Sequence, residues 1–373
     1  MSRMGNEEIR GHMAIRNPDG ERINSNVRGG MAHHDVDGLG GNKGGAAGGT
    51  RQRRGRLHPQ QSELQQPHHI AADIDRDAVH VGMELPSVFE NLADVNDLPV
   101  KKGVDLPFFW HVPRTGGGTV NDIFGGCLSL TLASDAGGGG TPGKENMLRI
   151  VEFSKHYSYV NVDTSTPEGI ERARALGLAS SEITDIVVST LLHQASTLFT
   201  TANRGRLFAM FRHPVDRAVS LFHFLQDTQW RRRQTFKKEL SELTIDEYFK
   251  SGLAENNWMT RFLTNQLKKG ELTRDDVNLA KEILRRKCLV GLLKEKGESF
   301  ARFERYFGFP VRSDAEKECH EKKLQWAWPL KHRHEEVEEG SALFDLILSH
   351  NMFDMELYEY AQTLFQEQAM IFQ

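Results

Sequence analysis

The pattern of hydrophobic and polar positions changes character near residue 106. From there on, short apolar runs rich in β-branched and aromatic residues predict buried strands. Helices are predicted from about Thr119 to Leu132, and again from Thr166-Pro167-Glu168, where a hydroxyl cap precedes an early proline. Strands that alternate with helices are typical of an α/β fold with a mainly parallel sheet. The predicted strands are "LPFFWHV" (106–112), "YSYVNVD" (157–163), "TDIVVST" (184–190) and "GRLFAMF" (205–211).

The C-terminal part of the chain has a helical pattern. The strand at 205–211 runs into "RHPVDRAVSLFHFLQ", which predicts a helix with Pro214 in its first turn. After about residue 228 the chain is predicted to be helical to its end. The sequence therefore predicts a three-layer α/β domain over residues 104–370, with a central sheet and a helical C-terminal part.

Residues 1–103 lack this periodicity. Residues 1–60 are polar, with nine glycines between Gly29 and Gly49, followed by the basic cluster "RQRRGR" at 51–56. Residues 61–103 remain polar, with a short helix expected near 85–94. This composition buries too little apolar surface to offset chain entropy, so a disordered Gly/Arg-rich tail is predicted over 1–103. The basic cluster could contact nucleic acid or acidic lipid, but a solvated tail is favoured.

Composition narrows the classes of function. The 373 residues are 38% hydrophobic and 26% charged, and the net charge is −4. A protein with this charge has no overall positive field that would attract nucleic acid or an anionic membrane. Any recognition of anions must therefore come from a local site. There is no run of 18 or more apolar residues and no apolar core in the first 30, so neither a membrane span nor a secretion signal is expected. The three cysteines, Cys127, Cys288 and Cys319, allow at most one bridge and leave the redox compartment open.

The first candidate site follows the strand at 106–112. Three glycines there expose backbone N–H groups that can close on phosphate oxygens, and the next helix would direct its positive end at the same anion. An arginine adds a planar cation, and two threonines add hydroxyl donors. The alternative is a glycine-rich turn that only reverses the chain. The candidate cradle comprises Pro113, Arg114, Thr115, Gly116, Gly117, Gly118 and Thr119.

A second glycine-rich segment resembles a phosphate-binding loop but lacks one of its essential residues. "GGGGTPGKE" places Gly138 and Gly143-Lys144 at the spacing of a phosphate-binding loop, but Glu145 stands where a Ser or Thr would hold magnesium. A carboxylate there would repel phosphate. A flexible loop is therefore the favoured interpretation.

The second candidate site begins where the strand at 205–211 ends. Arg212 follows that strand and Ser220 lies eight residues on, in the helix that Pro214 starts. The guanidinium and the hydroxyl can converge on one phosphate beside the sheet, and Arg217 adds another cation in the same helix. The alternative is an amphipathic helix with solvated arginines.

Taken together, "HVPRTGGGTV" and "FRHPVDRAVSLFHF" resemble the two nucleotide-binding motifs of the sulfotransferases that use 3′-phosphoadenosine 5′-phosphosulfate (PAPS). The first resembles the family's 5′-phosphosulfate loop, Pro-Lys-Thr-Gly-Gly/Ser-Thr-Thr/Ser, and the second its 3′-phosphate motif, Arg-Asp-Pro-x-x-Arg-x-x-Ser. The resemblance is closest to the carbohydrate branch, the heparan sulfate 2-O-sulfotransferase-like Golgi enzymes, and runs from about residue 106 to 365. Looser similarities lie at 256–263, 289–308 and 351–365.

The resemblance implies a P-loop-like sulfotransferase domain that moves a sulfuryl group from PAPS, its co-substrate, to a hydroxyl of a glycan. Negative charge builds on the bridging oxygen as the bisphosphate leaves, so preorganised cations and N–H donors are the main catalytic need. Arg114 and the glycine loop would meet that need, while Arg212 and Ser220 would hold the 3′-phosphate. No metal is required, and no ligand cluster with convincing spacing occurs.

In the carbohydrate enzymes a histidine between the two motifs acts as general base, and His193 in "TLLHQASTLF" occupies a matching place. A packed or surface histidine is the alternative. His193 follows a predicted strand, and the carboxyl ends of strands are where open α/β sheets hold ligands. His111 and His156 are weaker candidates, while Glu182 and Asp185 precede the same strand, at its opposite end.

The chain also departs from the family pattern. Arg114 replaces the usual Lys and cannot easily lend a proton to the leaving oxygen, and His213 replaces the usual Asp. Relatives of this branch are Golgi membrane proteins, so the Golgi is favoured and the cytoplasm is the alternative. The basic run at 230–238 could contact an anionic glycan or lie solvated. His332 and His334 are interpreted as part of a solvated charge run rather than a metal site.

Two other functions remain open from the sequence alone. One is a P-loop NTPase or kinase, which would need a Lys-Ser/Thr pair that the loop at 113–119 lacks. The other is a non-catalytic sulfotransferase-like protein that binds nucleotides or polyanions. No nucleic-acid partner is expected.

Overall fold

The computed structural model describes residues 15–16, 22–23, 87–139, 146–154, 157–226, 242–268, 270–325 and 336–373. The two short segments near the start, β1 (Ile15–Arg16) and β2 (Arg22–Ile23), pair antiparallel. The central sheet and its helices lie between residues 87 and 373, and all described residues belong to one compact unit.

A seven-stranded sheet organises the fold, with the strand order β5-β6-β4-β7-β3-β8-β9. β5 and β6 pair antiparallel, and every other neighbouring pair is parallel. The predicted α/β fold with a mainly parallel sheet is thereby confirmed. The strands are β3 (Asp105–Trp110), β4 (Thr131–Ala133), β5 (Ile150–Ser154), β6 (Tyr157–Val160), β7 (Ile186–Ser189), β8 (Arg204–Phe211) and β9 (Cys288–Leu292).

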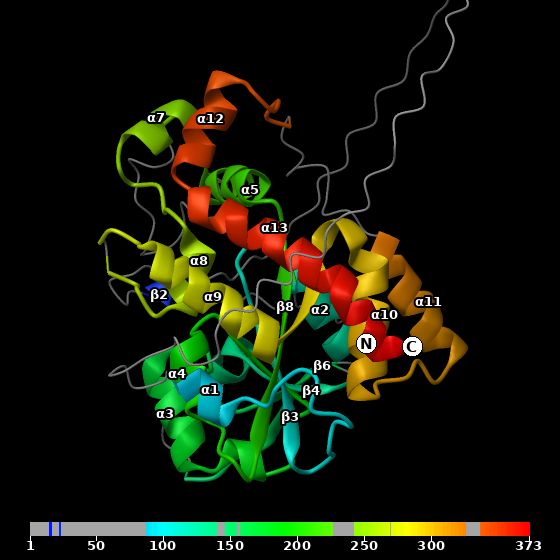
Figure 1. The fold of residues 1–373 in the computed structure, drawn as a ribbon. Coiled ribbons are helices and arrows are strands. Elements are labelled where there is room, and N and C mark those ends of the chain that lie inside the picture. Colours follow the sequence, from blue (N-terminus) through cyan, green and yellow to red (C-terminus); the bar gives the residue numbers. More distant parts are fainter. Residues whose placement is uncertain are drawn as a thin grey trace, which may run out of the picture. The chain divides into compact units, whose positions relative to one another are not determined.

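Both faces of the sheet are buried, because successive side chains of a strand point to opposite faces. In β3, Phe108 and Trp110 join one hydrophobic core, whereas Phe109 joins the other. In β8, Leu207 and Phe208 divide in the same way. Figure 1 shows the helices that cover these two cores, with α1, α3, α4, α8 and α9 on one side of the strands and α2, α10 and α11 on the other.

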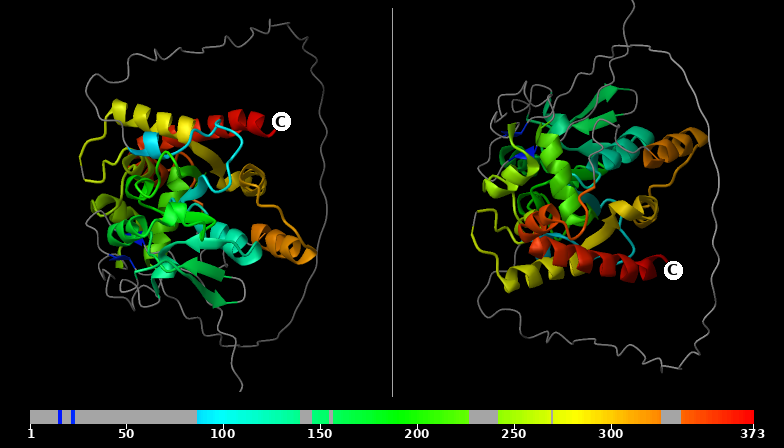
Figure 2. Two further views of the ribbon diagram at one scale, coloured as in Figure 1. Left: turned by 90° about the horizontal axis from the view of Figure 1, so that it is seen from below. Right: turned by 90° about the horizontal axis from the view of Figure 1, so that it is seen from above.

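The helices agree with the sequence pattern at several ends. As predicted, Thr166 caps α3, its hydroxyl accepting a hydrogen bond from the Gly169 amide at 3.0 Å. Figure 2 shows α9 and α13 lying side by side along one face of the domain. Among the described residues the α-helices and the π-helix are α1 (Ser87–Asn91), α2 (Gly117–Val120), a π-helix (Asn121–Cys127), α3 (Pro167–Ala175), α4 (Leu192–Ser196), α5 (Pro214–Gln226), α7 (Ile245–Lys250), α8 (Trp258–Leu263), α9 (Arg274–Lys287), α10 (Lys296–Phe307), α11 (Asp314–Gln325), α12 (Ala342–Ser349) and α13 (Met352–Glu367).

Two sequence predictions about element boundaries are wrong. The helix predicted over Thr119–Leu132 begins at Gly117 and ends at Cys127, and Leu132 lies in β4. The region beyond residue 228, predicted to be wholly helical, contains β9. This strand is only five residues long and lies between α9 and α10, so the helical pattern on either side obscures it.

The boundary of the predicted tail is also wrong. Residues 87–103 belong to the folded domain, in which the expected short helix near 85–94 forms as α1. Leu92 and Val95 are buried, and Leu92 forms a β-bridge with Gly205. The Lys287 ammonium donates to the Leu92 carbonyl at 2.8 Å. Only a few apolar residues of this segment pack against the domain, and its acidic residues pair with basic side chains. The segment therefore looks polar in sequence. Most of the remaining tail, residues 1–14, 17–21 and 24–86, lies outside the described residues.

Candidate functional site

The two candidate motifs lie at the same edge of the sheet. β3 and β8 are neighbouring parallel strands, so the segments that follow them emerge side by side. From β3 the chain passes through α2 and the π-helix toward β4, on the β7 side of β3. From β8 it passes through α5 toward β9, on the opposite side. In open α/β sheets, crossovers that diverge in this way mark the edge, at the carboxyl ends of the strands, where ligands bind.

The loop after β3 has an unusual backbone. Arg114 has φ of 68° and Gly116 has φ of 101°, both in the left-handed region. Left-handed residues interspersed with right-handed ones turn successive N–H groups into one concave surface that binds anions. A Cβ at Gly116 would lie 2.9 Å from Leu293 Cδ1, and one at Gly117 would lie 2.0 Å from His111 Cδ2. Close packing at both positions, with positive φ as well at Gly116, therefore requires glycine.

The loop passes directly into a helix. Gly116 is the N-cap of α2 and provides no side-chain cap, so no capping side chain covers the first N–H groups of the helix. The Thr115 hydroxyl donates to the Val112 carbonyl at 2.8 Å and fixes the bend of the chain. The hydroxyl hydrogen of Thr115, expected to contact phosphate, is thus engaged by the protein itself. Pro113 is buried, Gly118 is exposed, and Thr119 is half-buried.

Arg114 joins the two motifs. Its Nε donates to Ser220 Oγ at 3.1 Å, and its guanidinium carbon lies 4.7 Å from the centre of the Phe224 ring. Arg212 Nη1 lies 3.4 Å from the Arg114 carbonyl oxygen, at the long end of hydrogen-bond distance. Arg114 of the first motif and Arg212 and Ser220 of the second therefore form one cluster, with Ser220 only 3% exposed.

This cluster is strongly positive. Among the described residues, neither Arg114 nor Arg212 forms an ion pair with a carboxylate within 4.0 Å. Burial, and then repulsion from Arg212, lower the pKa of Arg114 to about 10. Burial also lowers the pKa of Arg212, although Asp216 acts in the opposite direction. Both groups stay charged at neutral pH, and each would gain from an anionic ligand.

Arg217 has a different environment from the other two arginines. It is fully buried, its Nη2 lies 2.5 Å from Glu255 Oε1, and its guanidinium carbon is 5.6 Å from the centre of the Trp258 ring. Because Glu255 compensates its charge, Arg217 joins α5 to the segment before α8 and adds no uncompensated charge to the cluster.

His193 lies on α4, just beyond the carboxyl end of β7. Its Nε2 is 2.7 Å from the Leu263 carbonyl oxygen, which can only accept, so Nε2 carries the hydrogen and Nδ1 is the atom able to take up a proton. Burial lowers the pKa of His193, partly offset by this hydrogen bond. In the described part of the chain, no hydrogen bond, ion pair or ring contact joins His193 to Arg114, Arg212 or Ser220.

The remaining residues that the sequence analysis considered for catalysis or binding fall into three groups. His111 is 7% exposed and contacts the loop, and burial followed by Arg114 lowers its pKa to about 4. Asp185 precedes β7 and accepts from the Thr131 amide at 2.7 Å, so it and nearby Glu182 lie at the other end of the strand, as predicted. His156, the basic run at 230–238, His332 and His334, and Gly143 to Glu145 lie outside the described residues.

Three contacts, two at the site and one elsewhere in the domain, have no counterpart in the sequence motifs. Phe224 lies one helical turn beyond Ser220 and carries the Arg114 guanidinium on its ring, which a spacing argument along α5 could have suggested. Leu293, which covers Gly116, follows the strand that the sequence pattern missed. The third is a disulfide between Cys127, at the end of the π-helix, and Cys319 of α11. The sequence allowed one bridge but did not select its partners.

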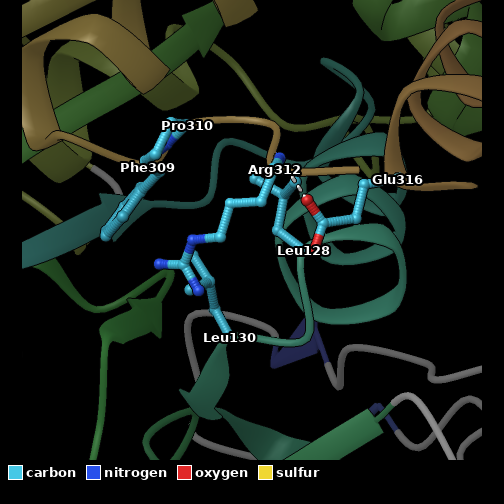
Figure 3. A pocket seen from close by; sticks show the side chains of 6 residues that line it. All are labelled: Leu128, Leu130, Phe309, Pro310, Arg312 and Glu316. Carbon is cyan, nitrogen blue, oxygen red and sulfur yellow. Dashed lines mark hydrogen bonds between the residues drawn. The ribbon is translucent and has the colours of Figure 1, made fainter. Parts of the chain in front are cut away.

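A surface hollow elsewhere is too small for a substrate. It measures about 10 Å³, and Figure 3 shows the residues around it, with the Arg312 amide donating to Glu316 Oε2 at 2.5 Å. A volume of this size holds about one water molecule. In the part of the chain that the structure describes, no group of three or more His, Cys, Asp or Glu side chains could hold a metal ion, and no helix has the length and apolar character to cross a membrane. The lining residues of the hollow are Leu128, Leu130, Phe309, Pro310, Arg312 and Glu316.

Comparison with known proteins gives no family assignment: no protein-family model matches the chain, and no curated protein matches it significantly.

Proposed function

We propose that this protein is a PAPS-dependent sulfotransferase with a P-loop-like domain, which transfers a sulfuryl group to a hydroxyl of a carbohydrate or glycan. One observation carries the proposal. Arg114 contacts Ser220 at 3.1 Å, and Arg212 lies against the Arg114 carbonyl, so the two phosphate motifs form one cationic cluster. A nucleotide with phosphates at both its 5′ and 3′ ends matches a site that joins two such motifs.

Within this proposal the loop and the cluster have separate tasks. The backbone N–H groups of Gly116 to Thr119 bind the 5′-phosphosulfate, and Arg212 and Ser220 bind the 3′-phosphate. In the reaction, the bond between sulfur and the 5′-phosphate oxygen breaks as the bond from sulfur to the acceptor oxygen forms. The leaving bisphosphate gains negative charge, which the loop N–H groups and Arg114 stabilise. Because Arg114 keeps its charge at neutral pH, it acts as a fixed cation rather than a proton donor.

His193 is the proposed general base. Its Nδ1 is the atom left to accept the hydroxyl proton of the glycan, because Nε2 donates to the Leu263 carbonyl. The lowered pKa keeps the imidazole neutral, and therefore basic, at physiological pH. Its place beyond β7, the neighbour of β3, supports a position at the same edge of the sheet as the loop.

The disulfide bears on the proposed location. Disulfides persist in oxidising compartments such as the secretory pathway and are rare in the cytosol. The bridge between Cys127 and Cys319 thus supports the Golgi rather than the cytoplasm as the place of action.

A second candidate function is nucleotide or polyanion binding without transfer. Arg114 favours it, because its guanidinium is directed to Ser220 and Phe224. A cation held on the 3′-phosphate side would strengthen binding while contributing less to the leaving 5′-phosphate.

The two candidates are separated by a transfer assay. Labelled PAPS is incubated with the protein and a panel of glycans, and transferred sulfate is counted. Transfer above the level of a His193→Gln variant supports the enzyme. Tight binding of adenosine 3′,5′-bisphosphate with no transfer to any acceptor supports the binding protein. Tighter binding of ATP than of the bisphosphate would contradict both and favour an NTPase or kinase.

A further inference from the structure

His111 is a buried polar residue to which the proposed reaction assigns no task. It follows β3 directly, its backbone amide donates to the Ser189 carbonyl at 2.9 Å, and its side chain is 7% exposed. The ring nitrogen Nδ1 is buried without a hydrogen-bond partner among the described residues. Burying an imidazole with one nitrogen unpaired costs free energy, and a hydrogen bond from its other nitrogen would offset part of that cost.

That other nitrogen lies against the anion loop. His111 Nε2 and Cδ2 lie 2.1 and 2.0 Å from the place a Cβ of Gly117 would occupy. In a helix the Cα–Cβ bond tilts toward the N-terminus, and Gly117 is the first residue of α2. The Nε2 edge of the ring therefore packs directly against Gly117, the first residue of α2, on the side that faces the N-terminal end of that helix.

We propose that His111 is a further anion-binding residue of this site, whose ring donates from Nε2–H to the phosphate or sulfate oxygens held by the loop. This rests on the proposed function for the identity of the nucleotide, but not for the presence of an anion. The role differs from that of a general base, since the ring binds the anion and leaves the acceptor proton to His193.

The charge around His111 agrees with this role. Of the charged groups near the ring, Arg114 is the one that acts on its titration, and with burial it lowers the pKa of His111 to about 4. The free ring is thus neutral at physiological pH, which places one hydrogen on one nitrogen. A bound dianion would offset the repulsion from Arg114 and raise the pKa again, so binding should take up protons in mildly acidic solution.

The test uses inorganic sulfate and adenosine 3′,5′-bisphosphate as separate probes. Affinity is measured by calorimetry for the wild type, His111→Leu and His111→Gln, with His320→Gln as a control histidine on α11. Gln can place an N–H donor near the position of Nε2, whereas Leu fills the space without one. We expect His111→Leu to lose about tenfold in affinity for both probes, and His111→Gln to stay within about threefold. Circular dichroism shows whether each variant is folded.

A second readout separates a donor from a packing residue. Sulfate keeps its two charges in mildly acidic solution, so a stronger affinity near pH 5 than at neutral pH reports protonation of the protein. We expect this gain in the wild type and its loss in His111→Gln. Equal affinities in the wild type and His111→Leu, or equal losses in His111→Leu and His111→Gln, would overturn the proposal.

Failure of the proposed function gives a different result. Wild-type protein that binds sulfate through His111 but not the bisphosphate would reject the sulfotransferase and keep the anion contact. Wild-type protein that binds neither probe would overturn both.

Discussion

Arg114 and Ser220 are 106 residues apart in sequence, yet the Nε of one lies 3.1 Å from the Oγ of the other. Parallel pairing of β3 with β8 brings them together, because both residues follow the carboxyl ends of neighbouring strands. The hydrogen bond also orients the guanidinium over Phe224. A cation fixed in this way needs little reorganisation when an anion binds, which is the arrangement that electrostatic catalysis requires.

Removing the Arg114 side chain should weaken nucleotide binding. We expect Arg114→Ala to lose at least about tenfold in affinity for adenosine 3′,5′-bisphosphate, because a buried charge-assisted contact is lost. Arg114→Lys keeps the charge but loses the Nε donor to Ser220, so a smaller loss of about threefold is expected. Calorimetric titration measures both, with Arg312→Ala beside the hollow of Figure 3 as the matched control. Equal affinities for wild type and Arg114→Ala would contradict the assignment.

Gly117 should not tolerate a methyl group. In Gly117→Ala the new Cβ would lie 2.0 Å from the buried His111 ring, so ring and loop must shift apart. We expect the free energy of unfolding to fall by about 1–3 kcal/mol, together with weaker anion binding.

The control for this clash is Gly297→Ala in α10, where a Cβ meets nothing within 4 Å. This variant should be neutral, or more stable by about 0.5–1 kcal/mol. The double variant His111→Ala with Gly117→Ala should lose less free energy of unfolding than the two single variants lose together, because the smaller side chain at position 111 removes the clash. Additive losses in denaturant titrations would show that the two residues do not interact.

Removing the proposed base should separate binding from transfer. Gln can donate to the Leu263 carbonyl as Nε2 does, but it cannot accept a proton, so His193→Gln should fold normally and lose at least about a hundredfold in kcat. Affinity for the bisphosphate should be unchanged.

The dependence of the wild-type turnover rate on pH gives an independent check of the role of His193. A base must be neutral, and burial lowers the pKa of His193. Turnover should therefore stay near its maximum as pH falls to the ordinary histidine pKa of about 6.5, and decline only below it. A decline that begins above this value would argue against His193.

The disulfide should contribute most of the anchoring of α11. This helix has no buried residues, and its other described contacts include the hydrogen bond from Lys323 to Asp122 at 3.1 Å and the one between His320 and Glu304 at 2.6 Å. Cys319→Ser should lower the free energy of unfolding by about 2–5 kcal/mol, because the bridge closes a separation of 192 residues.

Reduction provides the internal control for the bridge. Dithiothreitol should destabilise the wild type by a similar amount and leave Cys319→Ser unaffected. Limited proteolysis should then cleave near α11 in both reduced samples. A wild type whose stability does not change with dithiothreitol would show that this bridge does not form.

The sequence predicted β3, β6, β7 and β8 because each is a short apolar run, and the resemblance to the PAPS sulfotransferases implied that the two phosphate motifs bind one nucleotide. The sequence pattern missed β4, which it placed at the end of a helix, and it also missed β5. It missed β9, since a five-residue strand between α9 and α10 does not interrupt a helical pattern. It also placed Leu92 and Val95 in the tail, although both are buried. Isolated apolar residues in a polar segment show no periodicity, and only tertiary packing reveals their partners.

Within the site, the spacing of Arg212 and Ser220 indicated convergence but not the residue on which they converge. That residue is Arg114, whose positive φ no local pattern required. The contact of His111 with Gly117 depends on how the loop folds back over the end of β3, and the pairing of Cys127 with Cys319 depends on where α11 lies. Such long-range contacts are absent from any sequence window.

The central claim is that one site binds both phosphates of a 3′,5′-bisphosphorylated nucleotide. It is tested most directly by calorimetric titration of the wild type and Ser220→Ala with adenosine 3′,5′-bisphosphate, adenosine 5′-phosphate and ATP. We expect the wild type to bind the bisphosphate at least about tenfold more tightly than the other two nucleotides. We also expect Ser220→Ala to lose most of this preference while keeping its affinity for adenosine 5′-phosphate. Equal or tighter binding of ATP by the wild type would contradict it.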